Sequence, residues 1–198
     1  MARPLLIALL VVAVLVIAVV GWVVSVNNQL VRLDQDVNEK WAQVQNVYQR
    51  RADLIPNLVE TVKGFAAQER TVLEEVTRAR ASASGVQLTP QALNDPKALE
   101  RFRAAQEQLS GALSRLLVTV ERYPELKSNQ NFLALQTELA GTENRIAVER
   151  RRYNESVRDY NTRLRLAPAS LVAGALGFQP KAFFEAAPDA ATPPKVKF

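Results

Sequence analysis

The first hydrophobic pattern along the chain is an unbroken apolar run from Leu5 to Val24. A helix of these 20 residues is about 30 Å long, which matches the hydrocarbon core of a bilayer. Trp22 lies near one end of the run, where interfacial aromatic residues gather, and Arg3 precedes the other end. A cleaved signal peptide is the alternative, but its apolar region is usually shorter, and residues 25–29 offer no small-residue cleavage site. The run therefore predicts a retained transmembrane anchor.

Beyond the anchor, apolar residues recur at alternating spacings of three and four positions. This spacing places an apolar stripe on one face of each helix and charged side chains on the opposite face. No strand-like alternation competes with it. Three such runs extend from Leu30 to Ala83, from Leu99 to Tyr123 and from Phe132 to Leu164. We therefore expect an all-α protein, with the N-terminal transmembrane helix followed by an antiparallel up-and-down bundle of three to four long helices.

Capping and helix-breaking residues indicate where these helices end. Gly85 ends the first helical region, since glycine favours the turn that follows a helix. Asp95–Pro96 is typical of an N-cap followed by proline at the first helical position. Pro124 stops the second helix, Ser128 caps the third, and Pro168 closes it. The chain thus divides into an N-terminal segment with the anchor (1–27), a helical bundle (28–167) and an irregular C-terminal tail (168–198).

Residues 28–84 leave two arrangements open. As one unbroken helix they would extend about 85 Å, and the second helix would cover only about half of that length. Pro56 removes a backbone hydrogen bond, and Gly64 is a candidate C-cap, so a reversal near either residue would give a four-helix bundle. The apolar stripe keeps its register across both residues, however. A long kinked stalk that self-associates is therefore the alternative to the bundle.

The stretch RRADLIPNL, from Arg50 to Leu58, carries a charge on its apolar stripe. Arg51 lies one heptad from Val44 and one heptad from Leu58. A buried arginine needs a partner, because an unpaired charge inside a protein is costly. Glu149 holds a comparable place on the third helix, so we expect an Arg51–Glu149 ion pair; the alternative is that Arg51 extends outward over the core. Further candidates for structural or partner contacts in this stretch are Arg50, Asp53, Pro56 and Asn57.

Two Tyr-Asn pairs, Tyr153-Asn154 and Tyr160-Asn161, are seven residues apart and repeat on one helix face. We interpret both tyrosines as core residues with their hydroxyl groups at the rim, and a binding role is the alternative. In the tail, Phe178 and Phe184 are candidates for contacts with the bundle or with a partner. A short helical turn is expected near residues 170–175, and an extended chain beyond Pro188.

The composition restricts the chemistry that the chain can perform. It contains no histidine and no cysteine, so it has no imidazole base, no disulfide and no thiolate or imidazole metal ligand. The net charge of +5 comes from interleaved acidic and basic residues, which argues against a nucleic-acid site. Phosphate-binding glycine loops and nucleophile-elbow motifs are absent from the sequence. We therefore expect no enzymatic activity, no cofactor and no metal.

Several stretches resemble the signature sequences of the LemA family. They are RRADLIPNLVETVKGFAAQE (Arg50–Glu69), YPELKSNQNFLALQTELAGTENRIAVERRRYN (Tyr123–Asn154), VRDYNTRLRLAP (Val157–Pro168), LGFQPKAFFEA (Leu176–Ala186) and the ending PKVKF. The resemblance covers nearly all of the chain beyond the anchor. It implies a bacterial inner-membrane protein whose soluble part is an antiparallel four-helix bundle, and so favours the bundle over the stalk. It brings no catalytic residues, because the family has no established enzymatic activity. The sequence departs from the family at Phe65, where tyrosine is usual, and at Gln68, where histidine is common.

From these observations we expect a membrane-tethered helical scaffold that binds protein partners through the tail or the membrane-distal end of the bundle. Self-association is a further option. A lipid-binding or membrane-remodelling protein is the alternative, but it would need a broad apolar helix face rimmed by basic residues, whereas these stripes are narrow. The expected partners are the bilayer, through the anchor, and proteins, but not nucleic acid.

The distribution of basic residues around the anchor gives little indication of which side of the membrane the bundle faces. Arg3 precedes the anchor, while Arg32 and Lys40 follow it among acidic residues. The short basic N-terminus slightly favours a cytoplasmic N-terminus with the bundle outside.

Overall fold

A computed structural model describes residues 2–184, which form helices and loops without a strand. This confirms the all-α prediction. In chain order the elements are α1 (Ala2–Phe65), α2 (Arg70–Gly85), the 3₁₀ helix η1 (Pro90–Asn94), α3 (Pro96–Val120), the short α4 (Pro124–Lys127), α5 (Gln130–Arg165) and the 3₁₀ helix η2 (Ala169–Leu171). The end of the predicted tail, including the extended chain expected beyond Pro188, lies outside the described residues.

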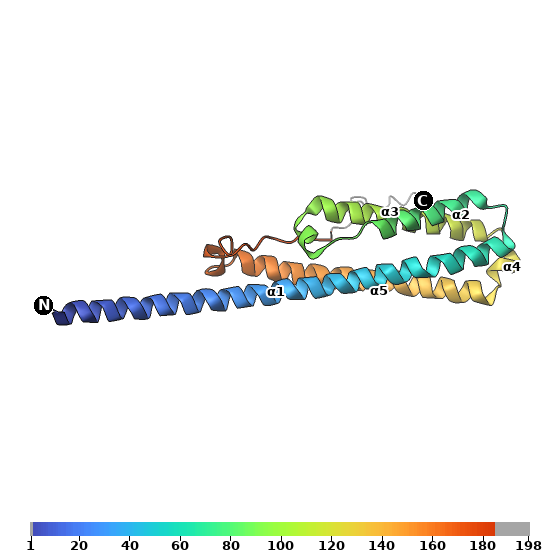
Figure 1. Ribbon diagram of the computed structural model, residues 1–198. Coiled ribbons are helices and arrows are strands. Elements are labelled where there is room, and N and C mark those ends of the chain that lie inside the picture. Colours follow the sequence, from blue (N-terminus) through green and yellow to red (C-terminus); the bar gives the residue numbers. More distant parts are fainter. Residues whose placement is uncertain (1, 185–198) are drawn as a thin grey trace, which may run out of the picture.

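Helices α1, α2, α3 and α5 run in alternating directions and form an antiparallel bundle (Figure 1). α1 packs along α5, and α2 packs on both α1 and α3. With 16 and 25 residues, α2 and α3 are shorter than the 64-residue α1 and the 36-residue α5. They therefore leave uncovered the part of the α1–α5 pair that is nearer the N-terminus (Figure 1). Residues 86–94, the first turns of α3 and the chain after α5 form the proximal core beside that part.

α1 is one continuous helix that contains both the predicted transmembrane run and one wall of the bundle. Its N-terminal part is long and apolar enough to cross a membrane. The side chains of residues 9–20 are exposed, and burial within the bundle begins with Val26 and Leu30, which are 3% and 0% exposed. The apolar run therefore leads into the bundle without a break in the helix.

α1 continues through Pro56, so this residue, one of the two candidate positions for a reversal, does not end the helix. Proline has no N–H, and the carbonyl of Ala52 therefore loses its helical donor. Arg80 of α2 replaces that donor, since its Nε donates a hydrogen bond of 2.7 Å to the Ala52 oxygen. The freed carbonyl is satisfied from a neighbouring helix, which allows the proline to remain within α1.

The chain reverses at the other candidate position. α1 ends at Phe65, directly after Gly64, and α2 begins at Arg70. Residues 28–84 therefore form parts of two helices, and neither the single unbroken helix nor the long stalk is present.

Local capping explains most of the remaining helix ends. Asp95 caps α3 as predicted, because its carboxylate accepts a hydrogen bond of 2.9 Å from the backbone N–H of Lys97. α2 ends at Gly85, also as predicted. Pro168 does follow α5 closely, but the helix already ends at Arg165.

Two predicted ends are wrong by a few residues. The cap of α5 is Asn129 and not Ser128, since the longer Asn129 side chain accepts hydrogen bonds from the N–H groups of Asn131 and Phe132. α3 ends at Val120, and Pro124 is the first residue of α4 instead of marking the end of α3. Proline lacks the N–H that a first helical position would leave unpaired, so it opens a helix as readily as it ends one.

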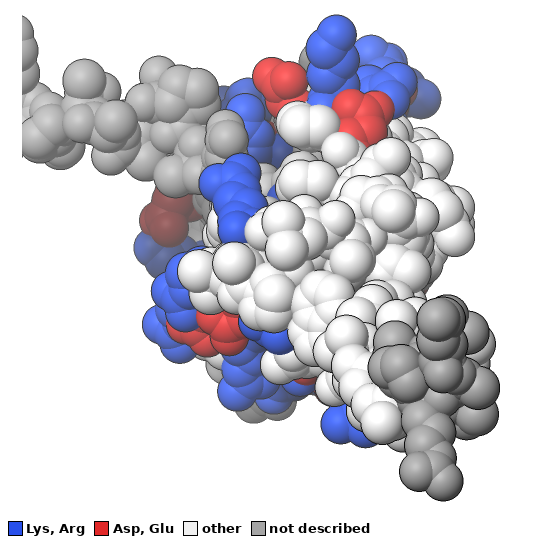
Figure 2. Space-filling model, turned by 90° about the vertical axis from the view of Figure 1, so that its left-hand side faces the viewer, with Lys and Arg blue, Asp and Glu red and all other residues white. Residues whose placement is uncertain are grey.

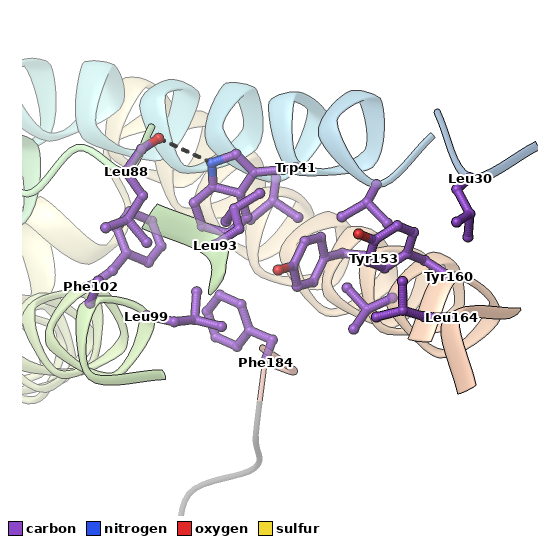
Figure 3. Packing of buried hydrophobic residues seen from close by; sticks show 14 of the residues in the cluster. Leu30, Trp41, Leu88, Leu93, Leu99, Phe102, Tyr153, Tyr160, Leu164 and Phe184 are labelled. Carbon is purple, nitrogen blue, oxygen red and sulfur yellow. Dashed lines mark hydrogen bonds between the residues drawn. The ribbon is translucent and has the colours of Figure 1, made fainter. Parts of the chain in front are cut away.

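Two apolar clusters fill the bundle. The distal cluster lies between α1, α2, α3 and α5 and includes Leu58 and Leu109. The proximal cluster lies nearer the N-terminal run and includes Trp41, Tyr153 and Phe184 (Figure 3). Trp41 is its centre, with its ring centroid 5.4 Å from that of Tyr153 and its indole N–H donating to the backbone of residue 88. The proximal cluster is completed by residues that follow α5.

Replacing Arg80 by alanine should lower the free energy of unfolding by about 1–2 kcal/mol, because the Ala52 carbonyl then has no donor. The same replacement in a Pro56→Ala background should cost much less, since residue 56 then supplies a helical N–H. Urea unfolding of the full chain in detergent micelles, followed by circular dichroism, measures both effects. Equal losses in the two backgrounds would show that Arg80 does not compensate for the proline.

Candidate functional site

Arg51 is a charged side chain buried in the middle of the bundle, with 1% of the residue exposed. Its guanidinium donates hydrogen bonds to the Glu143 carboxylate at 2.6 Å and to the Ser110 hydroxyl at 2.9 Å. It also donates to the side-chain and backbone oxygens of Gln106, at 2.6 and 3.3 Å. The guanidinium carbon lies 5.1 Å from the ring centroid of Tyr48. The charge is therefore paired inside the protein, and the outward orientation considered for Arg51 is wrong.

We call Arg51, Gln106, Ser110 and Glu143 the polar cluster. It contains residues of α1, α3 and α5, and Gln106 Nε2 donates a bond of 3.4 Å to the Ala83 carbonyl of α2. A single buried cation thus connects all four long helices. Such networks contribute little net stability against an apolar core of the same shape, but they strongly penalise packings that leave the charge unpaired.

The predicted Arg51–Glu149 ion pair is wrong because of the register between α1 and α5. Trp41 of α1 packs on Tyr153 of α5. Because these helices are antiparallel, the residue ten positions after Trp41 faces the residue ten positions before Tyr153. This register places Glu143 opposite Arg51. Glu149 pairs instead with Arg152 on its own helix, at 2.7 Å.

A groove of about 390 Å³ lies next to the polar cluster, between α3 and α5. These two helices approach each other less closely than the other neighbouring pairs of the bundle do. The lining residues are mostly apolar or uncharged, and they are Leu58, Ser110, Leu113, Ser114, Leu117, Gln136, Leu139, Ala140 and Glu143. Glu143, whose side chain is 48% exposed, is the charged residue among them. The groove therefore has an apolar floor with one carboxylate at its edge.

The Tyr-Asn pairs of α5 hold residues 179–184, which we call the C-terminal segment. Asn161 pairs with the backbone of Lys181 through two bonds of 2.9 Å, one to the carbonyl and one from the N–H. Asn154 pairs in the same way with Phe184, at 2.9 and 2.7 Å. The side-chain amides thus bind the segment as a neighbouring β-strand would, through donor and acceptor together.

Each tyrosine of these pairs adds a bond to the same segment. The Tyr153 hydroxyl donates to the carbonyl of Ala182 at 2.9 Å, and the Tyr160 hydroxyl donates to that of Gln179 at 3.0 Å. Both rings are buried, at 0% and 1% exposure. The tyrosines are core residues whose hydroxyls bind the chain's own C-terminal segment.

Two side chains of the C-terminal segment insert into the bundle. Phe184 packs near Trp41 and Phe102 (Figure 3). It also packs on Tyr48, and the Arg150 guanidinium lies 4.1 Å from its ring centroid. Lys181 Nζ forms a largely buried ion pair of 2.9 Å with Asp34 of α1. The segment therefore fills the part of the α1–α5 pair that α2 and α3 leave uncovered.

The contacts described above involve the sequence stretches that resemble a known family. RRADLIPNL contains the buried arginine, and the Tyr-Asn pairs and the LGFQPKAFF stretch bind one another. The sequence profile of the LemA family matches residues 40–198, which is most of the chain.

The chain belongs to the LemA family.

No curated protein matches the sequence of this LemA-family chain. Its described residues hold no group of three or more His, Cys, Asp or Glu side chains that could bind a metal ion. Burial raises the pKa of Tyr160 to about 12 and raises that of Tyr153 as well. Both hydroxyls therefore stay protonated near neutral pH and remain hydrogen-bond donors to the C-terminal segment.

The other residues that the sequence singled out lie apart from the polar cluster. Arg50, Pro56 and Asn57 are exposed, and so is Asp53, whose carboxylate accepts a bond of 2.7 Å from Gln49. Phe178 packs at the edge of the proximal cluster. The RRADLIPNL stretch thus supplies one buried charge, Arg51, the buried apolar residues Ile55 and Leu58, and an exposed outer face.

Sequence reasoning missed several partners in the LemA-family chain, namely Asp34, Gln106, Ser110, Glu143 and Lys181. Gln106 and Ser110 are four residues apart beside the apolar stripe of α3, a spacing that could have indicated a polar position facing the core. Glu143 and Lys181 carried no comparable signal, because their partners are set by helix register and by the path of the C-terminal segment.

Replacing Glu143 by glutamine should lower the free energy of unfolding by about 1–2 kcal/mol, because a half-exposed carboxylate that pairs a buried cation loses its charge. Glu149→Gln is the matched control on the same helix and should cost less than about 0.5 kcal/mol, since its partner Arg152 is solvent-exposed and leaves no buried charge unpaired. Urea unfolding of the two variants in micelles compares them. A larger loss for Glu149→Gln would contradict the pairing.

Replacing Asn161 by alanine should free the C-terminal segment, because the buried N–H and carbonyl of Lys181 both lose their partner. We expect a loss of about 2 kcal/mol and faster hydrogen exchange at the Lys181 amide. Asn144→Ala, at an exposed asparagine of the same helix, is the control and should change neither quantity. Unchanged exchange in Asn161→Ala would mean that the amide pairing does not hold the segment.

Proposed function

We propose that this LemA-family chain is a membrane-anchored scaffold that binds an amphipathic helix of a partner protein in the groove between α3 and α5. The anchor is the apolar run of α1, which crosses the bacterial inner membrane once and leads directly into the bundle. The groove is the observation that carries the proposal.

The shape and lining of the groove suit a helix. It lies between two antiparallel helices that are spaced apart, and an apolar helix face fits such a groove through residues three and four positions apart. Leu58, Leu113 and Leu139 form its floor. The cores of protein interfaces are depleted in charge, and Glu143 at the edge is the charged lining residue. A basic residue of the partner would pair with the exposed part of this carboxylate.

A second hollow lies between α1 and α2 and is a weaker candidate. Its lining carries five charged residues, which are Glu60, Lys63, Arg70, Glu74 and Arg78. Desolvating them would oppose the gain from burying apolar surface, so a stable partner helix is disfavoured there.

A non-enzymatic role agrees with how the polar residues are used. Arg51, Tyr153 and Asn161 are buried and bind other parts of the same chain. Each has the partners that a structural role requires. We therefore propose that the chain acts by binding and positioning proteins at the membrane.

The alternative, a membrane-remodelling protein, receives less support. Remodelling by an amphipathic helix requires an apolar helix face that is free to enter the bilayer. Beyond residue 25, the apolar stripes of α1, α2, α3 and α5 face the two buried clusters.

A photo-crosslinking amino acid at Ser114, an exposed residue in the groove, tests the scaffold in intact cells. We expect a discrete adduct with another protein, formed with a peptide that mass spectrometry places in an amphipathic helix. Ala140→Arg should abolish the adduct, because the larger side chain fills the groove. Ala134→Arg is the matched control, since Ala134 is also exposed on α5 but does not line the groove, and the adduct should persist.

Either of two results would overturn the proposal. One is the absence of any adduct when the chain is present at its normal level. The other is an adduct that survives Ala140→Arg, or one formed only with a second copy of the chain.

A further inference from the structure

The chain that follows α5 contains a long stretch without charge. Residues 166–180, which we call the apolar loop, have the sequence LAPASLVAGALGFQP. No residue in it is acidic or basic, although 23% of the whole chain is charged. Its polar side chains are Ser170 and Gln179. A surface loop of a water-soluble protein is normally polar, so this composition needs a physical cause.

The loop exposes its three leucines, while two of its alanines are buried. Leu171 is 77% exposed, Leu166 54% and Leu176 36%, whereas Ala169 and Ala173 are 0% and 3% exposed. This is the reverse of the distribution expected in water, where the leucines would face the core. An exposed cluster of this kind indicates contact with a partner or a membrane.

The position of the loop identifies the contact. Ala169 and Ala173 belong to the proximal cluster, and Trp22, near the end of the predicted transmembrane run, packs against the same cluster. Just before the loop, Arg163 donates a bond of 2.8 Å to Gln29 of α1. Figure 1 shows the loop beside α1 at the end of the bundle where the N-terminal run emerges. The loop therefore lies at the level where the predicted transmembrane run ends.

Basic residues lie beside the loop, at the edge of an uncharged surface. Figure 2 faces this end of the molecule and shows a broad surface without charged side chains, with Lys and Arg at its edges together with some Asp and Glu. Arg165 is exposed beside the loop and Arg163 is partly exposed. Basic side chains at the edge of an apolar surface reach lipid phosphates while their neighbours enter the acyl region.

We propose that the apolar loop is a second membrane contact, in which Leu166, Leu171 and Leu176 insert into the boundary between lipid headgroups and acyl chains beside α1. Two contacts on one bilayer restrict the tilt of the bundle, which a single helix leaves free. The occupant is the bilayer that holds the anchor, so this inference rests on the anchoring part of the proposed function.

Site-directed spin labelling tests the inference, and the cysteine-free chain makes it direct. Single nitroxide labels are placed on the full-length protein in phosphatidylcholine–phosphatidylglycerol vesicles, through Leu171→Cys and Leu176→Cys. Val118→Cys on α3, also apolar and 72% exposed, is the aqueous control, and Val16→Cys on the predicted transmembrane run is the lipid control. Collision rates with oxygen and with a water-soluble nickel chelate are measured at each position.

Labels in lipid collide often with oxygen and rarely with the nickel chelate. We expect this pattern at Leu171, Leu176 and Val16, and a several-fold higher nickel collision rate at Val118. An aqueous pattern at the two loop positions, with a lipid pattern at Val16, would overturn the inference and leave the anchor intact. Low rates with both reagents at the loop would also overturn it, because they indicate burial against protein. An aqueous pattern at Val16 would overturn the anchor itself.

Discussion

The architecture depends on one constraint, which is that an amphipathic helix must bury the whole of its apolar stripe. α1 and α5 pair over a longer distance than α2 and α3 can cover (Figure 1). The stripe that remains uncovered begins at Val26 and contains Trp41. The C-terminal segment covers it, with Phe184 filling the space among the aromatic rings. The Tyr-Asn pairs of α5 and the proximal cluster both follow from that requirement.

The polar cluster determines the register in which the helices pack. Apolar stripes tolerate sliding, since one leucine replaces another at little cost, but a buried guanidinium must meet its acceptors. Arg51 finds Glu143 and Gln106 only in the observed register of α1, α3 and α5. The cluster connects α3 to α1 and α5 through Arg51, and to α2 through the Ala83 carbonyl. It also supplies the carboxylate at the edge of the α3–α5 groove.

The proposed roles share one geometric consequence. A continuous α1 joins the anchor to the bundle, and the apolar loop would hold that bundle at a defined angle to the bilayer. The groove between α3 and α5 would then face a fixed direction relative to the membrane. A partner helix that is itself near the membrane would meet the groove with less loss of orientational freedom than on a freely tilting scaffold.

The sequence by itself determined the elements of this protein. The apolar run, the stripes of three and four spacing and the Asp95 cap are local features, and each is set by residues close in the chain. Burial of both tyrosines is also expected from their places on the stripes, whereas for Arg51 the sequence leaves both a buried pair and an outward orientation open. The tertiary structure alone decided three features. They are the continuation of α1 through Pro56, the partner of Arg51 and the position at which the C-terminal segment binds. Each of these depends on a donor or acceptor supplied by a residue distant in sequence: Arg80 for Ala52, Glu143 for Arg51, and Asn161 for Lys181. Helix register brings such pairs together, and periodicity in one helix carries no information about its register against another.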